Sequence, residues 1–319
     1  MPFVKTLACS LLKASSLAYD IDYTPGVAQT AQITQAIGAI GFDPASLRYK
    51  GIGNDQTDVD ACYFVTSDTA AILAFQGTLP PTWCTRSSKL FFKVLSDWLN
   101  DARVPLVSGD YLPGKVHRGF LGSLNNLWPD IEGWLADLKV SGKPLFITGH
   151  SKGGGLSYLG AYRALAKLGV APSGVYTFAS PRVGDTDFAA RFNATLNEVW
   201  RVEYQDDIVP HLPPETGTWV SLVDKLRSVI PHVTPSDVPW DTVSSFENLL
   251  DEVRERTEKG LPSYASAGEL QFIDWNDVIE TDSPILKWRR ESSLATKLID
   301  PPAIIEDHLL DNYSKGLGC

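Results

Sequence analysis

The sequence has no apolar run of about 18 residues or more, so no segment is long enough to cross a bilayer as a helix. It also lacks any cluster of basic residues, and its formal net charge is −10. A chain with this charge is a poor partner for nucleic acid, and an anionic membrane would not attract it electrostatically. Any contact with lipid would therefore have to be hydrophobic.

Cysteine is scarce, with four residues in a chain of 319. Cys9, Cys62, Cys84 and Cys319 do not have the spacing of metal ligands, so we expect no zinc site. Four cysteines in a chain of this length do not make a disulfide scaffold. The sequence leaves open whether any of them pair, including Cys9 with Cys319.

A clear secretion signal is also missing. Residues 1–19 contain a short apolar stretch, but a lysine interrupts it and no small-residue cleavage site follows cleanly. The segment fits an amphipathic helix of the folded protein better. The sequence does not decide whether the protein is cytoplasmic, secreted by a non-classical route or otherwise extracellular. It does not decide the oligomeric state either.

Apolar residues make up 44% of the chain, which is enough to fill a sizeable core. Short apolar runs alternate with stretches of helical periodicity, and this order predicts an α/β fold with a mostly parallel sheet covered by helices on both faces. Without repeats or linker-like composition, we expect one domain over 1–319, with an insertion within 215–262. The expected strands are 59–66, 70–75, 103–107, 145–147, 174–178, 199–204 and 270–273. The expected helices are 1–19, 29–40, 117–138, 156–168, 187–196, an amphipathic helix within 218–262 and a final stretch that contains His308.

Residues 144–155 contain the candidate nucleophile around which the rest of the site is expected to form. An apolar strand stops at Gly-His-Ser-Lys-Gly, and a helix follows directly. The glycines at 149 and 153 allow a tight turn that holds Ser151 up from the end of the strand. Because the free N–H groups of a helix N-terminus favour a developing negative charge, Ser151 is placed to act as a nucleophile. The strand, turn and helix together resemble the nucleophile elbow of α/β-hydrolases.

A serine nucleophile needs a histidine to take its proton, and five histidines are available. His117 precedes the serine, and His150 adjoins it in the turn, where its ring should point away. His211 and His232 lie near prolines in the loop after the last parallel strand. In α/β-hydrolases the acid and then the histidine follow the nucleophile, so chain order favours His308 without excluding the others.

The carboxylate that orients the histidine should follow a parallel strand. Asp206 and Asp207 both come directly after the strand expected at 199–204, and chain order alone does not separate them. The oxyanion of an ester hydrolase also needs N–H donors. The backbone of Lys152 is one expected donor, and the loop ending at Thr78 is the natural source of the other.

Five stretches of the chain, in order, resemble the class 3, fungal-type lipases, and a sixth at the C-terminal end follows the family's last motif. The resemblance implies an α/β-hydrolase fold and covers most of residues 60–214 as well as the C-terminal segment. The matching stretches are 75–78 (Phe-Gln-Gly-Thr), 116–120 (Val-His-Arg-Gly-Phe), 148–153 (Thr-Gly-His-Ser-Lys-Gly), 177–185 (Thr-Phe-Ala-Ser-Pro-Arg-Val-Gly-Asp), 207–213 (Asp-Ile-Val-Pro-His-Leu-Pro), and Asp307-His308 followed by Tyr313.

Carried over position by position, the resemblance makes Ser151 the nucleophile, Asp207 the acid and His308 the base. It also makes Thr78 a donor to the oxyanion, through its backbone N–H and its hydroxyl. Asp101 falls where the family has a carboxylate that can hold this hydroxyl.

Residues 88–100 have the spacing of an amphipathic helix, and in the family the region around 79–100 is a lid over the active site. The alternative is an ordinary helix packed on the core. Moving the four large apolar side chains of the lid into water would cost roughly 6–12 kcal/mol, so we expect the lid to open against lipid rather than in bulk water. These side chains are Phe91, Phe92, Leu95 and Trp98.

The chain departs from the family pattern at four places. Gln76 stands where an arginine is usual, and Lys152 follows the nucleophile, which should bring a cation near the acyl entrance. The segment 79–98 is longer than in the fungal pattern, and the insertion at 215–262 is additional. Acyl-chain length and head-group preference therefore stay open.

The activity implied by the resemblance is hydrolysis of acylglycerol esters through an acyl-enzyme, without metal or cofactor. The nearest alternatives use the same triad on another ester, as in a feruloyl or other carboxylesterase or a phospholipase. A binding protein on a hydrolase fold is a more distant alternative, because serine, aspartate and histidine are all present.

Overall fold

The computed structural model of the chain describes residues 2–53, 60–78, 105–213, 248, 251, 263–297 and 306–319. The lid expected within 79–100 and Asp101 lie outside these residues, as does nearly all of the insertion expected within 215–262.

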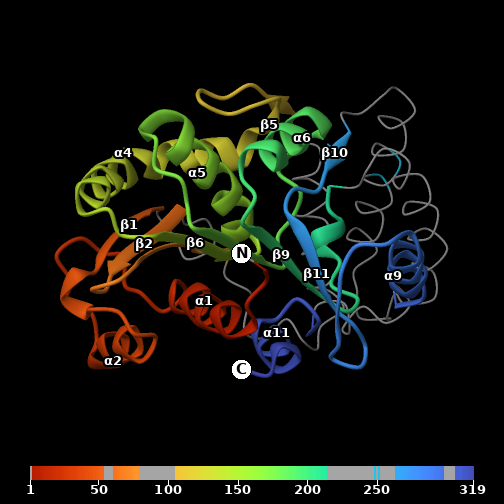
Figure 1. The fold of residues 1–319 in the computed structure, drawn as a ribbon, viewed down its shortest axis with the longest axis horizontal. Helices are drawn as coiled ribbons and strands as arrows, with labels where there is room; N and C mark the ends of the chain where they lie inside the picture. Colours follow the sequence, from red (N-terminus) through yellow and green to blue (C-terminus); the bar gives the residue numbers. More distant parts are fainter. Residues whose placement is uncertain are drawn as a thin grey trace.

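A sheet of eight strands forms the centre of the described structure (Figure 1). Its inner pairs, from the third strand to the seventh, are parallel, and the outer pairs on both edges are antiparallel. This is the mostly parallel sheet that the alternation of strands and helices predicts. From one edge to the other the strands are β1 (Arg48–Ile52), β2 (Asp60–Thr66), β3 (Ala71–Phe75), β6 (Leu145–His150), β7 (Gly174–Phe178), β9 (Val199–Tyr204), β11 (Glu269–Ile273) and β12 (Ile279–Glu280).

Helices cover both faces of the sheet (Figure 1). One face carries α4 (Arg118–Ser141), α5 (Lys152–Leu168) and α6 (Thr186–Thr195). The other carries α1 (Lys5–Leu17), α2 (Ala31–Ala39) and α11 (Leu310–Leu317), and α9 (Pro284–Lys297) flanks the sheet on the side of β11. Short 3₁₀ helices lie at η1 (Pro44–Ser46) and η3 (Val209–His211). No helix in the described ranges combines the length and apolarity needed to span a bilayer.

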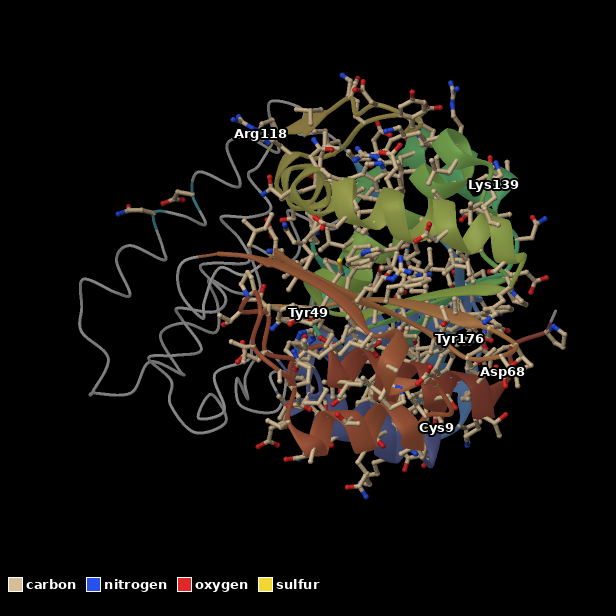
Figure 2. All side chains as sticks on the ribbon, turned by 90° about the vertical axis from the view of Figure 1, so that its left-hand side faces the viewer. Cys9, Tyr49, Asp68, Arg118, Lys139 and Tyr176 are labelled. Atoms are coloured by element: carbon tan, nitrogen blue, oxygen red, sulfur yellow. A yellow bond between two sulfur atoms is a disulfide. The ribbon has the colours of Figure 1, made fainter. Side chains whose placement is uncertain are left out.

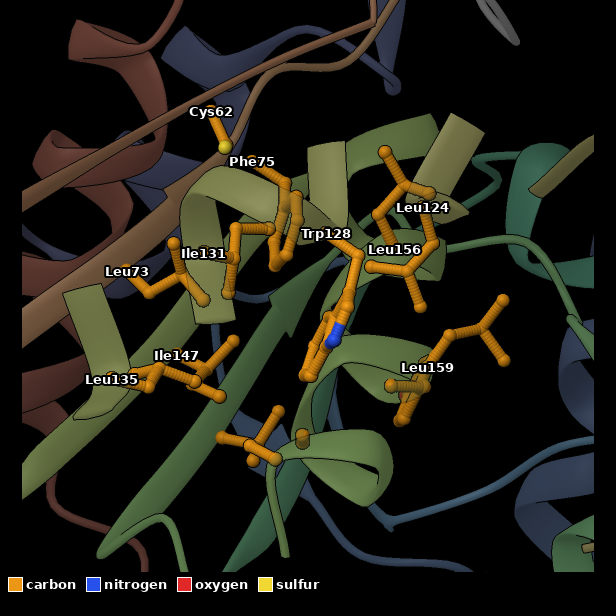
Figure 3. Packing of buried hydrophobic residues seen from close by; sticks show 14 of the residues in the cluster. Cys62, Leu73, Phe75, Leu124, Trp128, Ile131, Leu135, Ile147, Leu156 and Leu159 are labelled. Carbon is orange, nitrogen blue, oxygen red and sulfur yellow. The ribbon is translucent and has the colours of Figure 1, made fainter. Parts of the chain in front are cut away.

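The strands are apolar on both sides because both faces of the sheet are buried. Along β2, Cys62 and Phe64 join the core under α4 and α5, whereas the alternating Tyr63 and Val65 join the core under α1 and α2. Figure 3 shows the first of these cores, with Trp128 of α4 among its members. Burying one large apolar side chain stabilises the fold by about 1.5–3 kcal/mol, so the two cores fix the strand register firmly.

A small second sheet was not predicted from the sequence. It pairs β10 (Tyr264–Ala265), β8 (Gly184–Asp185), β5 (Val116–His117) and β4 (Leu106–Val107), all antiparallel. Strands of two residues have no readable periodicity. The strand expected at 103–107 is reduced to β4 within the described residues, and β1, β12 and α9 were missed as well.

Within the described residues a disulfide joins Cys9 to Cys319, one of the pairings that the sequence left open, and Cys84 lies outside these residues. It joins α1 to the residue after Gly318, the cap of α11, and these two helices also pack against each other. In Figure 2, Cys9 lies on the opposite side of the sheet from Lys139 of α4. Cys62 is a free thiol, and its burial raises its pKa well above the usual value.

Candidate active site

The turn between β6 and α5 holds Ser151 in a strained conformation, with φ 57° and ψ −128°. Side chains at the flanking glycines would not fit. A Cβ on Gly149 would overlap the carbonyl of Gly153, and a Cβ on Gly153 would overlap the carbonyl of Phe75 at the end of β3. The strand, sharp turn and helix predicted for 144–155 are confirmed, and Ser151 stands at the N-terminus of α5.

Ser151, His308 and Asp207 form a continuous hydrogen-bonded row. The hydroxyl oxygen of Ser151 lies 3.0 Å from Nε2 of His308. Nδ1 of the same ring lies 3.0 Å from Oδ2 and 3.1 Å from Oδ1 of Asp207. All three side chains are buried, at 8%, 7% and 2% exposure respectively, so the row is largely shielded from water. His308 occupies a turn just before α11, rather than the final helix itself.

Asp207 is held by two further donors. The hydroxyl of Tyr313 donates to Oδ2 at 2.7 Å, and the backbone N–H of Val209 donates to Oδ1 at 2.9 Å. Tyr313 is fully buried, and its oxygen accepts from the backbone N–H of Tyr204 at 3.2 Å. Burial and the nearby Asp207 charge raise the pKa of Tyr313 well above its usual value, so its hydroxyl stays a donor.

Asp206 faces away from this row, which separates the two acid candidates. Its Oδ2 accepts from the indole N–H of Trp275 at 2.9 Å, and its backbone N–H donates to Oδ2 of Asp307 at 3.2 Å. Partial burial, together with the charges of Asp206 and Asp207, raises the pKa of Asp307 to about 7. A carboxyl that titrates near neutrality therefore adjoins His308 in the chain.

The two expected oxyanion donors come from adjacent strand ends. In the parallel pairing of β3 with β6, Phe75 stands opposite Gly149, so the residues after β3 run beside the turn that carries Ser151. Gly77 approaches His150 so closely that a Cβ there would lie 2.6 Å from the His150 carbonyl oxygen. Thr78 follows directly and is exposed.

Lys152 begins α5, where the first backbone N–H groups have no acceptor within the helix. Its side chain, which the sequence analysis expects to bring a cation near the acyl entrance, forms an ion pair. Its Nζ lies 2.7 Å from Oδ1 of Asp60, and the two side chains are 19% and 14% exposed. Asn126 donates to the other oxygen of Asp60 at 3.0 Å, so the charge of Lys152 is neutralised against the start of β2.

The other histidines make different contacts. His117 caps α4 and accepts from the backbone N–H groups of Gly119 and Phe120. His211 is held near Nη2 of Arg290, at 3.5 Å, and burial beside several cations lowers its pKa to about 3. His232 and the lid residues Phe91, Phe92, Leu95 and Trp98 lie outside the described residues.

The ring of His150 was expected to point away from the site, and this expectation is wrong. Nε2 of the ring lies 2.8 Å from the backbone oxygen of His308, and Nδ1 lies 2.8 Å from the hydroxyl of Tyr19. The sequence analysis also assigned no contact to Tyr19 and no role to the hydroxyl of Tyr313. Neither tyrosine stands within 100 residues of the partner it reaches, so no local pattern could have identified them.

No group of three or more His, Cys, Asp or Glu side chains in the described part of the chain is arranged to hold a metal ion.

Comparison with known proteins relates this geometry to one family. Residues 85–217 match the family described as Lipase (class 3). The chain is 29% identical over 246 residues to Lipase ZK262.3 of Caenorhabditis elegans, covering 76% of this chain and 62% of that protein. It is 31% identical over 188 residues to Phospholipase A1-II 3 of Oryza sativa subsp. japonica, covering 47% of this chain and 44% of that protein. The chain thus spans less than two thirds of either relative.

Among solved structures, a lipase from Rhizopus microsporus var. chinensis superposes with a TM-score of 0.58 at 18% identity. The superposition covers 96% of this chain and 85% of the fungal one. It shows the α/β-hydrolase fold, in agreement with the doubly covered sheet of the described residues.

Proposed function

We propose that the chain, whose residues 85–217 match the class 3 lipase family, hydrolyses carboxylic esters of acylglycerols, with Ser151 as nucleophile, His308 as base and Asp207 as acid. The observation that carries this proposal is the buried row of hydrogen bonds from Ser151 through His308 to Asp207, which begins at a strained turn. In the same proposal, residues 1–319 form one domain, with a lid within 79–100 and an insertion within 215–262.

The proposed reaction has two halves. Ser151 Oγ attacks the ester carbonyl carbon while His308 Nε2 takes the hydroxyl proton, and the resulting imidazolium is stabilised by Asp207. The tetrahedral intermediate expels the alcohol, which receives the proton from His308, and an acyl-serine remains. Water then attacks the acyl-serine with His308 again as base, and the carboxylic acid leaves as Ser151 is reprotonated. These steps use only groups of the chain, the ester and one water.

The oxyanion of both intermediates needs donors that are already in place. We assign this role to the backbone N–H groups of Thr78 and Lys152. One donor of this kind contributes about 2.7–4 kcal/mol to transition-state stabilisation. The Lys152 ion pair with Asp60 supports the assignment, since it fixes the first residue of α5 from its side-chain end.

A phospholipase is the second candidate, favoured by the similarity to the rice Phospholipase A1-II 3. It would use the same three residues on the acyl ester of a phosphoglyceride. The two candidates differ only in the head group, so a substrate panel separates them.

The test measures hydrolysis of p-nitrophenyl esters of increasing acyl length, emulsified triacylglycerol and phosphatidylcholine vesicles. Labelling by a fluorophosphonate is measured in parallel. Ser151→Ala should abolish both labelling and turnover, and His308→Ala should lower both strongly. Turnover that rises on the emulsion supports an acylglycerol lipase acting at an interface, and turnover only on vesicles supports the phospholipase. If the wild type shows neither labelling nor turnover of any ester, the proposed function is wrong.

A further inference from the structure

His150 stands between two parts of the proposed site that come from distant segments of the chain. On one side, its Nε2 lies 2.8 Å from the backbone oxygen of His308. On the other, its Nδ1 lies 2.8 Å from the hydroxyl of Tyr19, which follows α1. The imidazole is 2% exposed, and its ring centroid lies 4.8 Å from that of His308.

The direction of each hydrogen bond follows from chemistry. The backbone oxygen of His308 can only accept, so Nε2 of His150 carries the proton. The ring of His150 is neutral, because burial and the adjacent His308 lower its pKa well below the usual value. Nδ1 is then an acceptor, and the Tyr19 hydroxyl must donate to it.

The row of hydrogen bonds continues to residues 76–78, the oxyanion loop, which ends at Thr78. The backbone N–H of Gly77 donates to the oxygen of Tyr19. A Cβ on Gly77 would overlap this hydroxyl, so only glycine allows the loop to come so close. Gly77 immediately precedes Thr78, the residue assigned as an oxyanion donor. Three hydrogen bonds of fixed direction therefore link the loop of Thr78, through Tyr19 and His150, to the main chain of His308.

We propose that Tyr19 and His150 are positioning residues that hold the oxyanion loop and the backbone of His308 at a fixed distance from each other. This inference rests on the proposed ester hydrolysis. Neither residue would touch the substrate or exchange a proton with it. Their effect is geometric, because they fix the distance between the base and the oxyanion donors before the substrate arrives.

A neutral His150 ring is compatible with the charge that forms on His308 during the reaction. During the reaction His308 becomes an imidazolium within 4.8 Å of the His150 ring. A positively charged His150 would repel the His308 imidazolium, whereas a neutral ring does not. Because Nε2 of His150 already carries a proton and Nδ1 already accepts from Tyr19, this ring has no free nitrogen that could take the proton from His308.

The test compares Tyr19→Phe with Tyr23→Phe. Both tyrosines are partly buried in the segment after α1, and each donates one hydrogen bond of 2.8 Å. The Tyr23 hydroxyl, however, donates to the backbone oxygen of Ala18 rather than to a residue of the proposed site. Tyr19→Phe should lose somewhat more thermal stability than Tyr23→Phe, because it also removes the acceptor of the Gly77 N–H, and only Tyr19→Phe should lose activity beyond this difference in stability.

For Tyr19→Phe we expect kcat on a soluble p-nitrophenyl ester to fall by about 10- to 100-fold with KM within about twofold of the wild type, since small misplacement of catalytic donors has effects of this size. Affinity for a trifluoromethyl ketone, whose adduct with Ser151 carries an oxyanion, should fall by the same factor as kcat/KM. Tyr23→Phe should stay within about twofold on both measurements.

A readout independent of turnover is the nitrogen NMR spectrum of histidine-labelled protein. The His150 signals should show a neutral ring protonated at Nε2 from pH 5 to pH 9, and the Nδ1 signal should move in Tyr19→Phe. Equal activity and equal ketone affinity in the two tyrosine variants would overturn the inference while leaving the proposed function intact. No turnover by the wild type would overturn the proposed function and the inference together.

Discussion

The hydroxyl of Tyr313 offers the sharpest test of how the acid of the proposed triad is supported. Replacing Tyr313 with phenylalanine removes one oxygen and keeps the ring, which is fully buried. Two hydrogen bonds are lost: the hydroxyl no longer donates to Asp207, and the backbone N–H of Tyr204 no longer finds its acceptor. Asp207 keeps the donors Val209 and His308.

The size of the effect can be worked out from these contacts. A hydrogen bond to a charged group contributes about 1.5–3 kcal/mol, against about 0.5–1.5 kcal/mol for one between neutral groups. With unfolding entropies near about 2.1 cal/mol/K per residue, about 1 kcal/mol corresponds to roughly 1.5 °C in this chain of 319 residues. Losing one hydrogen bond of each kind costs about 2–4.5 kcal/mol, so Tyr313→Phe should lower Tm by about 3–7 °C. Because Asp207 keeps two of its three donors, kcat/KM should fall by no more than about 30-fold, or about 2 kcal/mol.

Tyr63→Phe is the matched control. Tyr63 is also fully buried, and its hydroxyl donates to the neutral backbone oxygen of Ala14 at 2.8 Å. We expect it to lower Tm by about 1–2 °C and to leave kcat/KM unchanged. Melting curves and ester kinetics of both variants measure how much the hydrogen bond from Tyr313 to Asp207 contributes to stability and to activity. If Tyr313→Phe is no more destabilising than Tyr63→Phe, the charged hydrogen bond to Asp207 does not have the assumed strength. If kcat/KM falls about 1000-fold at unchanged stability, the hydroxyl takes part in the chemistry itself.

Three further predictions concern the surroundings of the site. The folded-state pKa of Asp307 is raised to about 7, so the folded protein binds this proton more tightly than the unfolded chain, and stability should decline as pH rises from about 4 to about 7. Allowing for its partial exposure, Asp307→Asn should recover about 1–2 kcal/mol at pH 8 and nothing at pH 4, as measured by denaturant unfolding at both pH values. Removing the disulfide by Cys9→Ser together with Cys319→Ser should cost about 2–5 kcal/mol, and a reducing agent should lower the Tm of the wild type but not of this variant. In a double-mutant cycle, the variant carrying both Lys152→Met and Asp60→Asn should lose about 1–3 kcal/mol less stability than the sum of the losses in the two single variants; additive losses would mean that the ion pair is solvated.

The central part of the fold and the proposed triad could be predicted because their signals are local. Ser151 lies in a short glycine-flanked pattern between an apolar run and a run of helical periodicity, and the structure has the strand, the sharp turn and the helix. Chain order favours His308 over the other histidines without excluding them. Asp207 and Asp206 are adjacent and chemically identical, so their separation needed either the family resemblance or the tertiary contacts to Tyr313 and Trp275.

Other features could not be predicted because the residues that define them are far apart in the sequence. β1 lies at an edge of the sheet and contains Arg48 and Lys50, so it lacks the apolar pattern of an inner strand. The side chain of Lys152 could have pointed to solvent or to substrate, and only the fold brings it to Asp60, 92 residues away. The second sheet depends on pairings between segments that are each two residues long.

Two of the contacts that hold the proposed site come from the face of the sheet covered by α1 and α11. Tyr19 follows α1 and reaches the oxyanion loop, whereas Tyr313 lies in α11 and reaches Asp207. The Cys9–Cys319 disulfide ties these two helices to each other. If this face acts as one support, opening the disulfide should make Tyr313→Phe less costly, because α11 is then already loosened. If the helices act separately, the two losses in stability should simply add.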